Sequence, residues 1–212
     1  MSIHKTRTTA ALILTAVLFT APAWALTQKE FMSICQKGSA LDIAAALKDE
    51  GISAAKADAQ GVTPLMMAVQ NRGAAADASK IAMLVNAGNK VNAQTGSGIS
   101  ALMYAAQTTD NPDVIIKLFQ AGANVEAEND KGWTALSFAA ARNPSTDVLE
   151  AIIDCGADVN ASDRTGATPL MLAIRGGNEY AVIDALLKAG ADPTIPDLNK
   201  RTCQSYLKRT RS

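Results

Sequence analysis

Histidine is almost absent from this sequence of 212 residues, and the single copy, His4, lies at the very start of the chain. The remaining residues therefore offer no imidazole as a general base, a zinc ligand or an axial haem ligand. Ser-His, Cys-His and two-histidine metal arrangements are excluded on this ground. The carboxylates fall mostly at expected turns and helix surfaces, where they are ordinarily solvated. We expect no catalytic residue, no metal site and no cofactor, and we do not expect an enzyme.

An apolar run long enough to cross a bilayer is also lacking. The longest, residues 10–21, is well short of the roughly 20 residues that a membrane-spanning helix needs. It follows the basic residues Lys5 and Arg7 and precedes Ala23-Trp24-Ala25, a small-x-small pattern, so residues 1–25 have the layout of a cleaved secretory signal. We expect cleavage after Ala25 and export to the periplasm of a Gram-negative host, without stable membrane insertion.

The sequence also lacks a large excess of positive or negative charge. Without residues 1–25 the chain has 18 basic and 20 acidic residues, a formal charge of −2. This near-neutral balance argues against nucleic acid as a partner. Aromatic residues make up only 4% of the sequence while alanine is abundant, which favours closely packed small helices over a sandwich or barrel.

Glycine is present at fixed intervals. Gly61, Gly98, Gly132 and Gly166 are 37, 34 and 34 residues apart. A second series, ten residues ahead of the first, runs through the five positions Gly51, Gly88, Gly122, Gly156 and Gly190. The extra residues of the 37-residue intervals fall within 71–80. A fixed period of this length indicates stacked structural repeats.

The sequences around these glycines are similar from one unit to the next. The first series is followed by "VTPLMMAVQ", "ISALMYAAQ", "WTALSFAAA" and "ATPLMLAIR", and "GADVNA" follows one helix end at 156–161. These motifs resemble ankyrin repeats, which carry G-x-T-P-L-x-x-A-A and a closing G-A-D-V-N-A. The resemblance implies an all-α repeat solenoid in which stacked helix-turn-helix units are joined by β-hairpin-like turns. The expected units are a divergent N-terminal repeat at 26–57, full repeats at 58–93, 94–127, 128–161 and 162–196, and a C-terminal cap at 197–212.

Helix boundaries follow from local chemistry. Thr63-Pro64 and Thr168-Pro169 are typical of a helix N-cap followed by the first helical residue. Ser100 and Thr134 are expected to cap the equivalent helices, and the second glycine series suits the left-handed residue that ends a helix. Where the family usually has a histidine, three units have a methionine, which we interpret as a core side chain, and the fourth has Ser137. These methionines are Met66, Met103 and Met171.

Three cysteines, an odd number, are spread over distant units: Cys35, Cys155 and Cys203. Helices pack about 8 to 10 Å apart, whereas a disulfide needs α-carbons within about 7 Å. We therefore expect no intramolecular disulfide. Cys155 is interpreted as a small packed residue, since alanine holds its position in other units. A thiol that pairs with a partner is the alternative, for which Cys203 is the best candidate.

The family resemblance also implies where a partner binds: a concave groove formed by the turn tips and the exposed faces of the first helices. Trp133 is our first candidate, and packing against the neighbouring hairpin is its alternative role. Arg142 and Arg175 are candidates for pairing with acidic groups of the partner. The other binding candidates are Val62, Gln70, Ile99, Gln107, Lys131 and Arg164, with Gln60, Asn71, Ser97, Thr108, Ala141 and Ala167 also placed on this face.

The sequence thus favours an exported, non-catalytic protein, expected to be a monomer, that binds another protein. It is similar to periplasmic ankyrin proteins associated with catalase and peroxide resistance, and to others that act as immunity partners of secreted toxins. A haem or small-molecule handling protein is the alternative class. Without a histidine in the mature chain, haem ligands would have to come from Cys, Met or Tyr, and absorbance spectra with added haem test that alternative.

Overall fold

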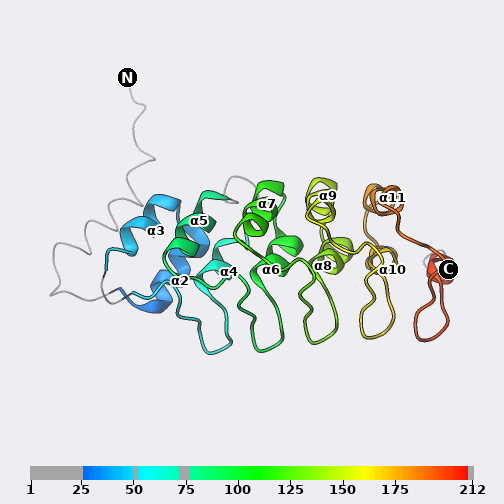
Figure 1. Cartoon of the computed structure of the whole chain (residues 1–212), viewed down its shortest axis with the longest axis horizontal. Helices are drawn as coiled ribbons and strands as arrows, with labels where there is room; N and C mark the ends of the chain where they lie inside the picture. The colour runs from blue at the N-terminus through cyan, green and yellow to red at the C-terminus, as the bar shows by residue number, and fades with distance from the viewer. Residues whose placement is uncertain (1–25, 50–51, 72–76, 210–212) are drawn as a thin grey trace, which may run out of the picture.

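The computed structural model describes residues 26–49, 52–71 and 77–209, and the expected secretory signal lies outside them. The described residues form an elongated stack of short helices that runs from the N-terminal to the C-terminal end of the molecule (Figure 1). In chain order the helices are α2 (Gln28–Lys37), α3 (Ala40–Ala46), α4 (Pro64–Ala68), α5 (Ser79–Asn86), α6 (Ala101–Thr108), α7 (Pro112–Gln120), α8 (Ala135–Arg142), α9 (Thr146–Asp154), α10 (Pro169–Gly176), α11 (Tyr180–Lys188) and α12 (Cys203–Arg209).

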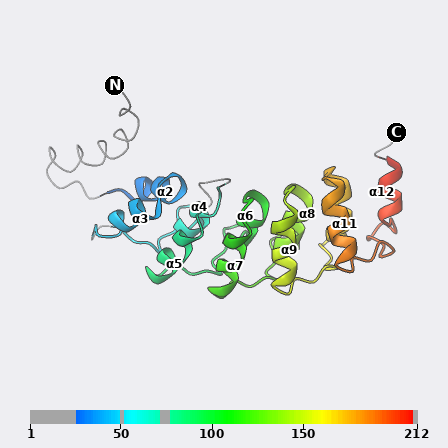
Figure 2. The same ribbon diagram turned by 90° about the horizontal axis from the view of Figure 1, so that it is seen from above.

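The helices pack in two parallel rows. α2, α4, α6, α8, α10 and α12 contact one another in sequence as the first-helix row, and α3, α5, α7, α9 and α11 do so as the second-helix row. Each first helix also packs on the second helix that follows it, so every unit is a helix pair stacked on the next pair (Figure 2). One continuous apolar core runs from Phe31 in α2 to Tyr206 in α12. The expected all-α solenoid of stacked helix pairs is confirmed.

The expected caps are confirmed. Thr63, Ser100, Thr134 and Thr168 each accept a hydrogen bond from the backbone N–H three residues further on, which satisfies a donor that the helix leaves unpaired. The methionines that follow the caps are buried core residues, as expected. Two of them also act in capping: the sulfurs of Met66 and Met103 accept from the N–H of Thr63 at 3.4 Å and of Ser100 at 3.5 Å.

Each helix pair is followed by a hairpin that closes over five residues. The backbone N–H of its first residue donates to the carbonyl of its last, as in Asn129 to Trp133 at 3.1 Å and Asp163 to Ala167 at 3.0 Å. Successive hairpins are also joined directly, because Arg164 N–H donates to the Lys131 carbonyl at 3.0 Å. Equivalent bonds join Gly96 to Gln60, Asp130 to Ser97 and Leu198 to Thr165. These hairpins form the row of loops along the lower edge of Figure 1.

Asparagines between the two helices of a pair, one buried and one half-buried, tie neighbouring units together. The Asn143 side chain, only 1% exposed, donates to the carbonyls of Ala106 at 2.9 Å and Thr109 at 2.7 Å in the preceding unit. Asn178 repeats the pattern one unit later, donating to the carbonyls of Ala140 and Asn143. These amides satisfy backbone acceptors that would otherwise be buried without a partner.

The C-terminal end copies the repeat in shortened form. Lys200 has φ 60° and is the one non-glycine residue with positive φ among the described residues; it follows Gly166 by one 34-residue period. The helix that follows, α12, packs on α10 and closes the stack. Its Tyr206 hydroxyl donates to Asp197 at 2.5 Å. In the described residues no helix has the length and apolarity of a membrane span.

Candidate functional site

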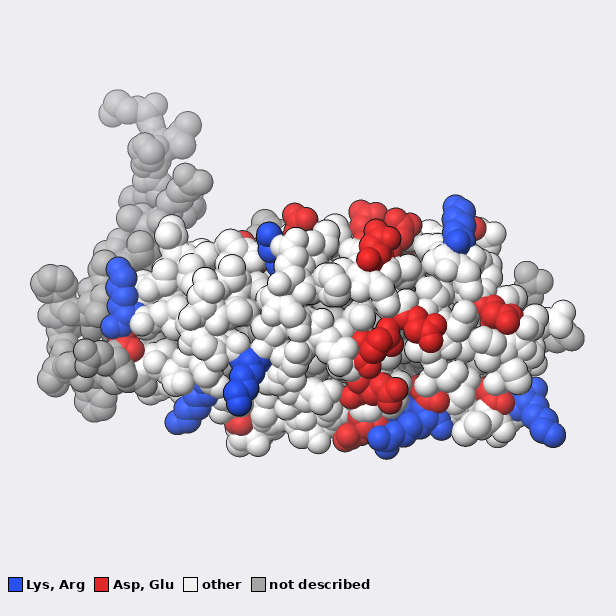
Figure 3. Space-filling model, viewed as in Figure 1, with Lys and Arg blue, Asp and Glu red and all other residues white. Residues whose placement is uncertain are grey.

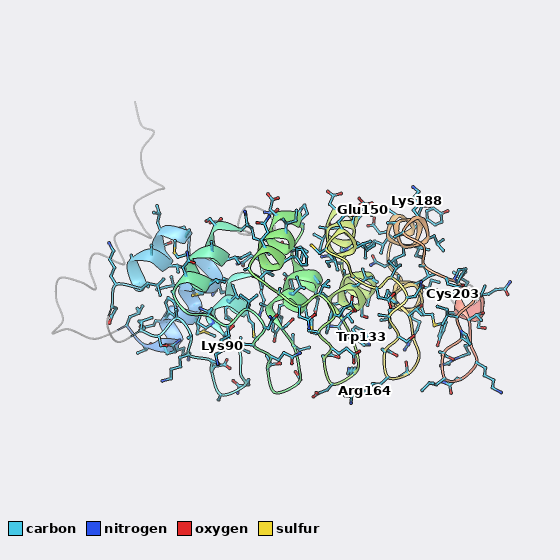
Figure 4. The ribbon with its side chains drawn as sticks, viewed as in Figure 1. Lys90, Trp133, Glu150, Arg164, Lys188 and Cys203 are labelled. Atoms are coloured by element: carbon cyan, nitrogen blue, oxygen red, sulfur yellow. The ribbon has the colours of Figure 1, made fainter. Side chains whose placement is uncertain are left out.

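Trp133 lies at the end of a hairpin, where the chain turns into α8 (Figure 4). Its side chain is half-buried, and its indole N–H donates to Asp163 Oδ2 of the next hairpin at 3.0 Å. One ring edge meets Phe138 at 5.1 Å between centroids with an interplanar angle of 71°. The predicted alternative role, packing against the neighbouring hairpin, is therefore present. The remaining exposed part of the ring is held in a fixed orientation.

Arg142 completes this aromatic cluster from the C-terminal end of α8. Its guanidinium carbon lies 5.6 Å from the Trp133 ring centroid and 5.8 Å from that of Phe138, within the range of a cation–π contact. Arg142 is exposed to solvent. The cation can therefore keep its place over the rings and still offer N–H donors to a carboxylate.

Arg175 lies apart from that cluster. Its guanidinium carbon is 5.6 Å from the Tyr206 ring of α12, and Arg201 approaches the same ring at 5.1 Å. The structure therefore connects Arg175, which is exposed, with the C-terminal cap rather than with Trp133. The two arginines are also one residue out of register: the 34-residue period brings Arg142 onto Gly176 and Arg175 onto Ala141.

The residue at the start of each hairpin was not among the sequence-based candidates, although it organises this surface. Asp163 Oδ1 accepts from the backbone N–H of Thr165 at 2.7 Å and of Ala167 at 2.9 Å, while its Oδ2 holds the Trp133 indole. The same position is held by Asp58, Thr95, Asn129, Asp163 and Asp197, and each side chain accepts a backbone N–H of its own hairpin. The shared signal is an acceptor side chain at intervals of 37, 34, 34 and 34 residues.

Asp197 is the most strongly perturbed carboxyl of the series. Burial alone would raise the pKa of Asp197. The hydrogen bonds that it accepts from the Tyr206 hydroxyl and from the backbone and guanidinium of Arg201 lower the pKa by more than burial raises it, so the pKa is well below the usual range. The Arg201 guanidinium also forms an ion pair with Asp197 at 2.9 Å. Asp197 is thus an ionised structural group that joins the last hairpin to α12.

Ala167 was wrongly placed on the exposed face. Its side chain is fully buried, at 0% exposure, and belongs to the continuous apolar core. Val62 and Ile99, at the same position in earlier units, are half-buried and pack against the core, so only part of each apolar side chain reaches the surface.

The remaining candidates fall into two groups. Lys131 and Arg164 are exposed at the hairpin tips, and Figure 4 shows Arg164 at the edge of the molecule beyond Trp133. Gln70 and Gln107 are half-buried; Gln70 lies just after the end of α4, and Gln107 lies in the last turn of α6. The structure thus brings both Arg142 and Asp163 into contact with Trp133. We define Lys131, Trp133, Arg142 and Arg164 as the hairpin face.

The three cysteines are free thiols. Cys35 is fully buried, and this burial raises its pKa to about 12. Cys203, the sequence-based candidate for pairing with a partner, is 3% exposed, which argues against that role. Only Cys155 is partly exposed, and burial together with Asp154 raises its pKa. Among the described residues no three His, Cys, Asp or Glu side chains form a group that could hold a metal ion.

Stacked helix pairs, joined hairpins and an exposed face held by inter-unit hydrogen bonds define a class of tandem-repeat scaffold. Residues 102–197 match the family model described as ankyrin repeats in three copies. This part of the chain is similar to ankyrin repeats, and repeats of this kind suggest a protein-binding role. A search of curated proteins found no match.

Proposed function

We propose that this protein is a non-catalytic scaffold that binds a partner protein through the hairpin face. The observation that supports this proposal most strongly is the arrangement around Trp133. Its indole N–H is held by Asp163 at 3.0 Å, and the Arg142 guanidinium lies 5.6 Å from its ring centroid. Tryptophan and arginine are enriched among residues that dominate binding energy, and a surface ordered before binding loses less entropy on association.

The chemistry of the hairpin face favours an acidic segment of the partner. Lys131, Arg142 and Arg164 are the exposed cations of this face, and Arg142 lies over the Trp133 ring. Arg142 retains N–H groups that can bind a carboxylate in a bidentate manner. An apolar side chain beside that carboxylate would cover the exposed part of Trp133.

Affinity capture with matched single variants tests this proposal. The immobilised protein is incubated with a periplasmic extract, and captured proteins are quantified by mass spectrometry. Arg142→Ala should reduce capture of the specific partner about tenfold or more, as expected for a binding hot spot. Lys48→Ala, which removes an exposed cation from the N-terminal unit, should not change it. Equal capture by both variants would contradict the proposed face.

Trp133 needs a second readout because it also packs within the fold. Trp133→Phe keeps an aromatic ring against Phe138 but removes the N–H that donates to Asp163. If the residue only packs, this variant lowers the melting temperature and leaves capture unchanged. The proposal requires that capture also falls, at a temperature where both proteins are folded.

We further propose that the protein acts in the periplasm after removal of residues 1–25, whose layout supports this. The mature protein purified from a periplasmic fraction should then begin at Leu26, as read by N-terminal sequencing. A protein that is found in the cytoplasmic fraction and still begins at Met1 or Ser2 would contradict export.

Two biological settings fit an exported scaffold of this kind: support of catalase in peroxide resistance, and immunity against a secreted toxin. Both derive from the resemblance to exported bacterial ankyrin proteins. The identity of the captured partner separates them, since a catalase supports the first and a toxin domain supports the second. Capture that depends on Arg142 but yields neither would remove both settings and leave the binding function intact.

A further inference from the structure

A shallow apolar groove lies between α7 and α9, in the second-helix row and away from the hairpin face. Ile116 and Phe119 of α7 are 38% and 44% exposed, and both line this groove, so the two apolar side chains form one continuous surface with it. The residues that line it are Pro112, Ile116 and Phe119 from α7 and Asp147, Glu150, Ala151, Asp154 and Cys155 from α9.

The α9 side of the groove carries charge of one sign. Asp147, Glu150 and Asp154 line it, and α9 contains neither Lys nor Arg. None of the salt bridges found among the described residues involves these three carboxylates. A cation that does act on Glu150 is Lys188, whose pKa is raised chiefly by Asp184 and to a smaller extent by Glu150, and the Lys188 ammonium pairs with Asp184 at 2.7 Å. Figure 3 shows acidic side chains gathered where α9 lies, and Figure 4 shows Glu150 at that edge of the molecule.

This charge is unfavourable for the isolated helix. Asp147 and Glu150 are three residues apart and Glu150 and Asp154 are four apart, which places like charges beside each other on one helix face. Asp154 is also the last residue of α9, where a carboxylate opposes the helix dipole. A cation bound against this side would relieve both effects.

The neighbouring helices carry other residues at the same positions. One period before Glu150 is the exposed apolar residue Ile116, and one period after it is Asp184. Asp184 is paired with Lys188 at 2.7 Å, and Lys188 holds the position of Asp154. The next pair of second helices, α9 and α11, therefore lacks the combination of an apolar side with an acidic side free of ion pairs.

We propose that the α7–α9 groove docks a cationic amphipathic segment of a partner protein. Apolar side chains of the segment pack on Ile116 and Phe119, and its Lys or Arg side chains pair with Asp147, Glu150 and Asp154. These carboxylates are spaced i, i+3 and i+7 and extend over about 10 Å of helix. A partner helix with cations at the same spacing matches them along one side. The negative charge disfavours an anionic lipid surface or a nucleic acid as occupant.

Binding of a defined probe peptide tests this surface independently of the hairpin face. The probe is a fluorescent amphipathic peptide of leucine and lysine, roughly 14 residues long, and the reference peptide has glutamate in place of lysine. Fluorescence anisotropy is measured with the purified protein at low and high ionic strength. The lysine peptide should bind at low salt and weaken as salt is added, whereas the glutamate peptide should not bind.

Matched variants locate the binding. Glu150→Gln with Asp154→Asn should weaken lysine-peptide binding at least tenfold, and Phe119→Gln should weaken it in the same direction. Glu128→Gln with Asp130→Asn makes the same change of charge at exposed hairpin residues and should leave binding unchanged. All substitutions are at exposed positions, and circular dichroism verifies that each variant is folded.

Two outcomes would overturn the proposal. The first is equal binding by the two double variants, which would make the attraction a property of net charge rather than of this groove. The second is self-association in sedimentation equilibrium that Phe119→Gln abolishes, because the occupant would then be a second copy of this chain.

Discussion

Gly132 provides a direct test of how closely successive hairpins are joined. A Cβ at this position would lie 2.9 Å from the Arg164 backbone N, so Gly132→Ala pushes the next hairpin away. Gly156 is the matched control, because it also has positive φ, 93° against 76°, but a Cβ there meets nothing within 4 Å. Both alanine variants carry the strain of a left-handed conformation, and only Gly132→Ala adds a collision.

The magnitude follows from these contacts. Left-handed strain costs about 1–2 kcal/mol, partly offset by the lower backbone entropy of unfolded alanine, so Gly156→Ala should lose about 1 kcal/mol. For Gly132→Ala, overpacking adds about 1–3 kcal/mol. Loss of the bond from Arg164 N–H to the Lys131 carbonyl adds about 1 kcal/mol. The free energy of unfolding of Gly132→Ala should therefore fall by about 3–5 kcal/mol in total.

Urea unfolding followed by circular dichroism measures the free energy of unfolding of both variants. Hydrogen exchange at the Arg164 amide reports on the hairpin junction itself, and should become faster in Gly132→Ala only. Equal destabilisation of the two variants, with unchanged exchange at Arg164, would refute the close junction.

Three further predictions concern the core, the thiols and the C-terminal cap. Asn143→Ala leaves two backbone carbonyls of the preceding unit without their donor, and should lower the free energy of unfolding by about 2–4 kcal/mol; a loss below roughly 0.5 kcal/mol in urea titration would contradict this role. A thiol reagent should label Cys155 alone in the folded protein and all three cysteines in denaturant; fast labelling of Cys35 would show that it is not buried. Because the folded-state pKa of Asp197 is lowered, its stabilisation should be complete above about pH 4 and lost as the pH falls further. Asp197→Asn should flatten the acid limb of the thermal melting profile, and an unchanged slope would remove Asp197 as its source.

The fold was accessible from the sequence because its signals are local and repeated. A capping hydroxyl such as Thr63 acts within one turn of its own helix, and Gly88 ends a helix through its own backbone conformation. The period then places every such signal in the same frame. Even Lys200, which is not a glycine, takes the positive φ of Gly166 one period earlier, because the hairpin around it repeats.

The surface was less predictable because it depends on contacts between units. Ala167 was assigned to the exposed face from its register, yet its side chain is fully buried in the core. The hydrogen bond from Trp133 to Asp163 joins residues 30 positions apart. Whether it forms depends on how one unit is oriented relative to the next, which the sequence does not give. The α7–α9 groove likewise combines side chains of two units, so neither Phe119 nor Glu150 indicates it alone.

Hydrogen–deuterium exchange of the protein with and without its captured partner tests the central claim most directly. If the hairpin face binds the partner, protection should increase in peptides that cover residues 128–142 and 162–168, and Arg142→Ala should abolish that increase. Protection confined to other segments, with 128–142 and 162–168 unchanged, would contradict the proposed binding face.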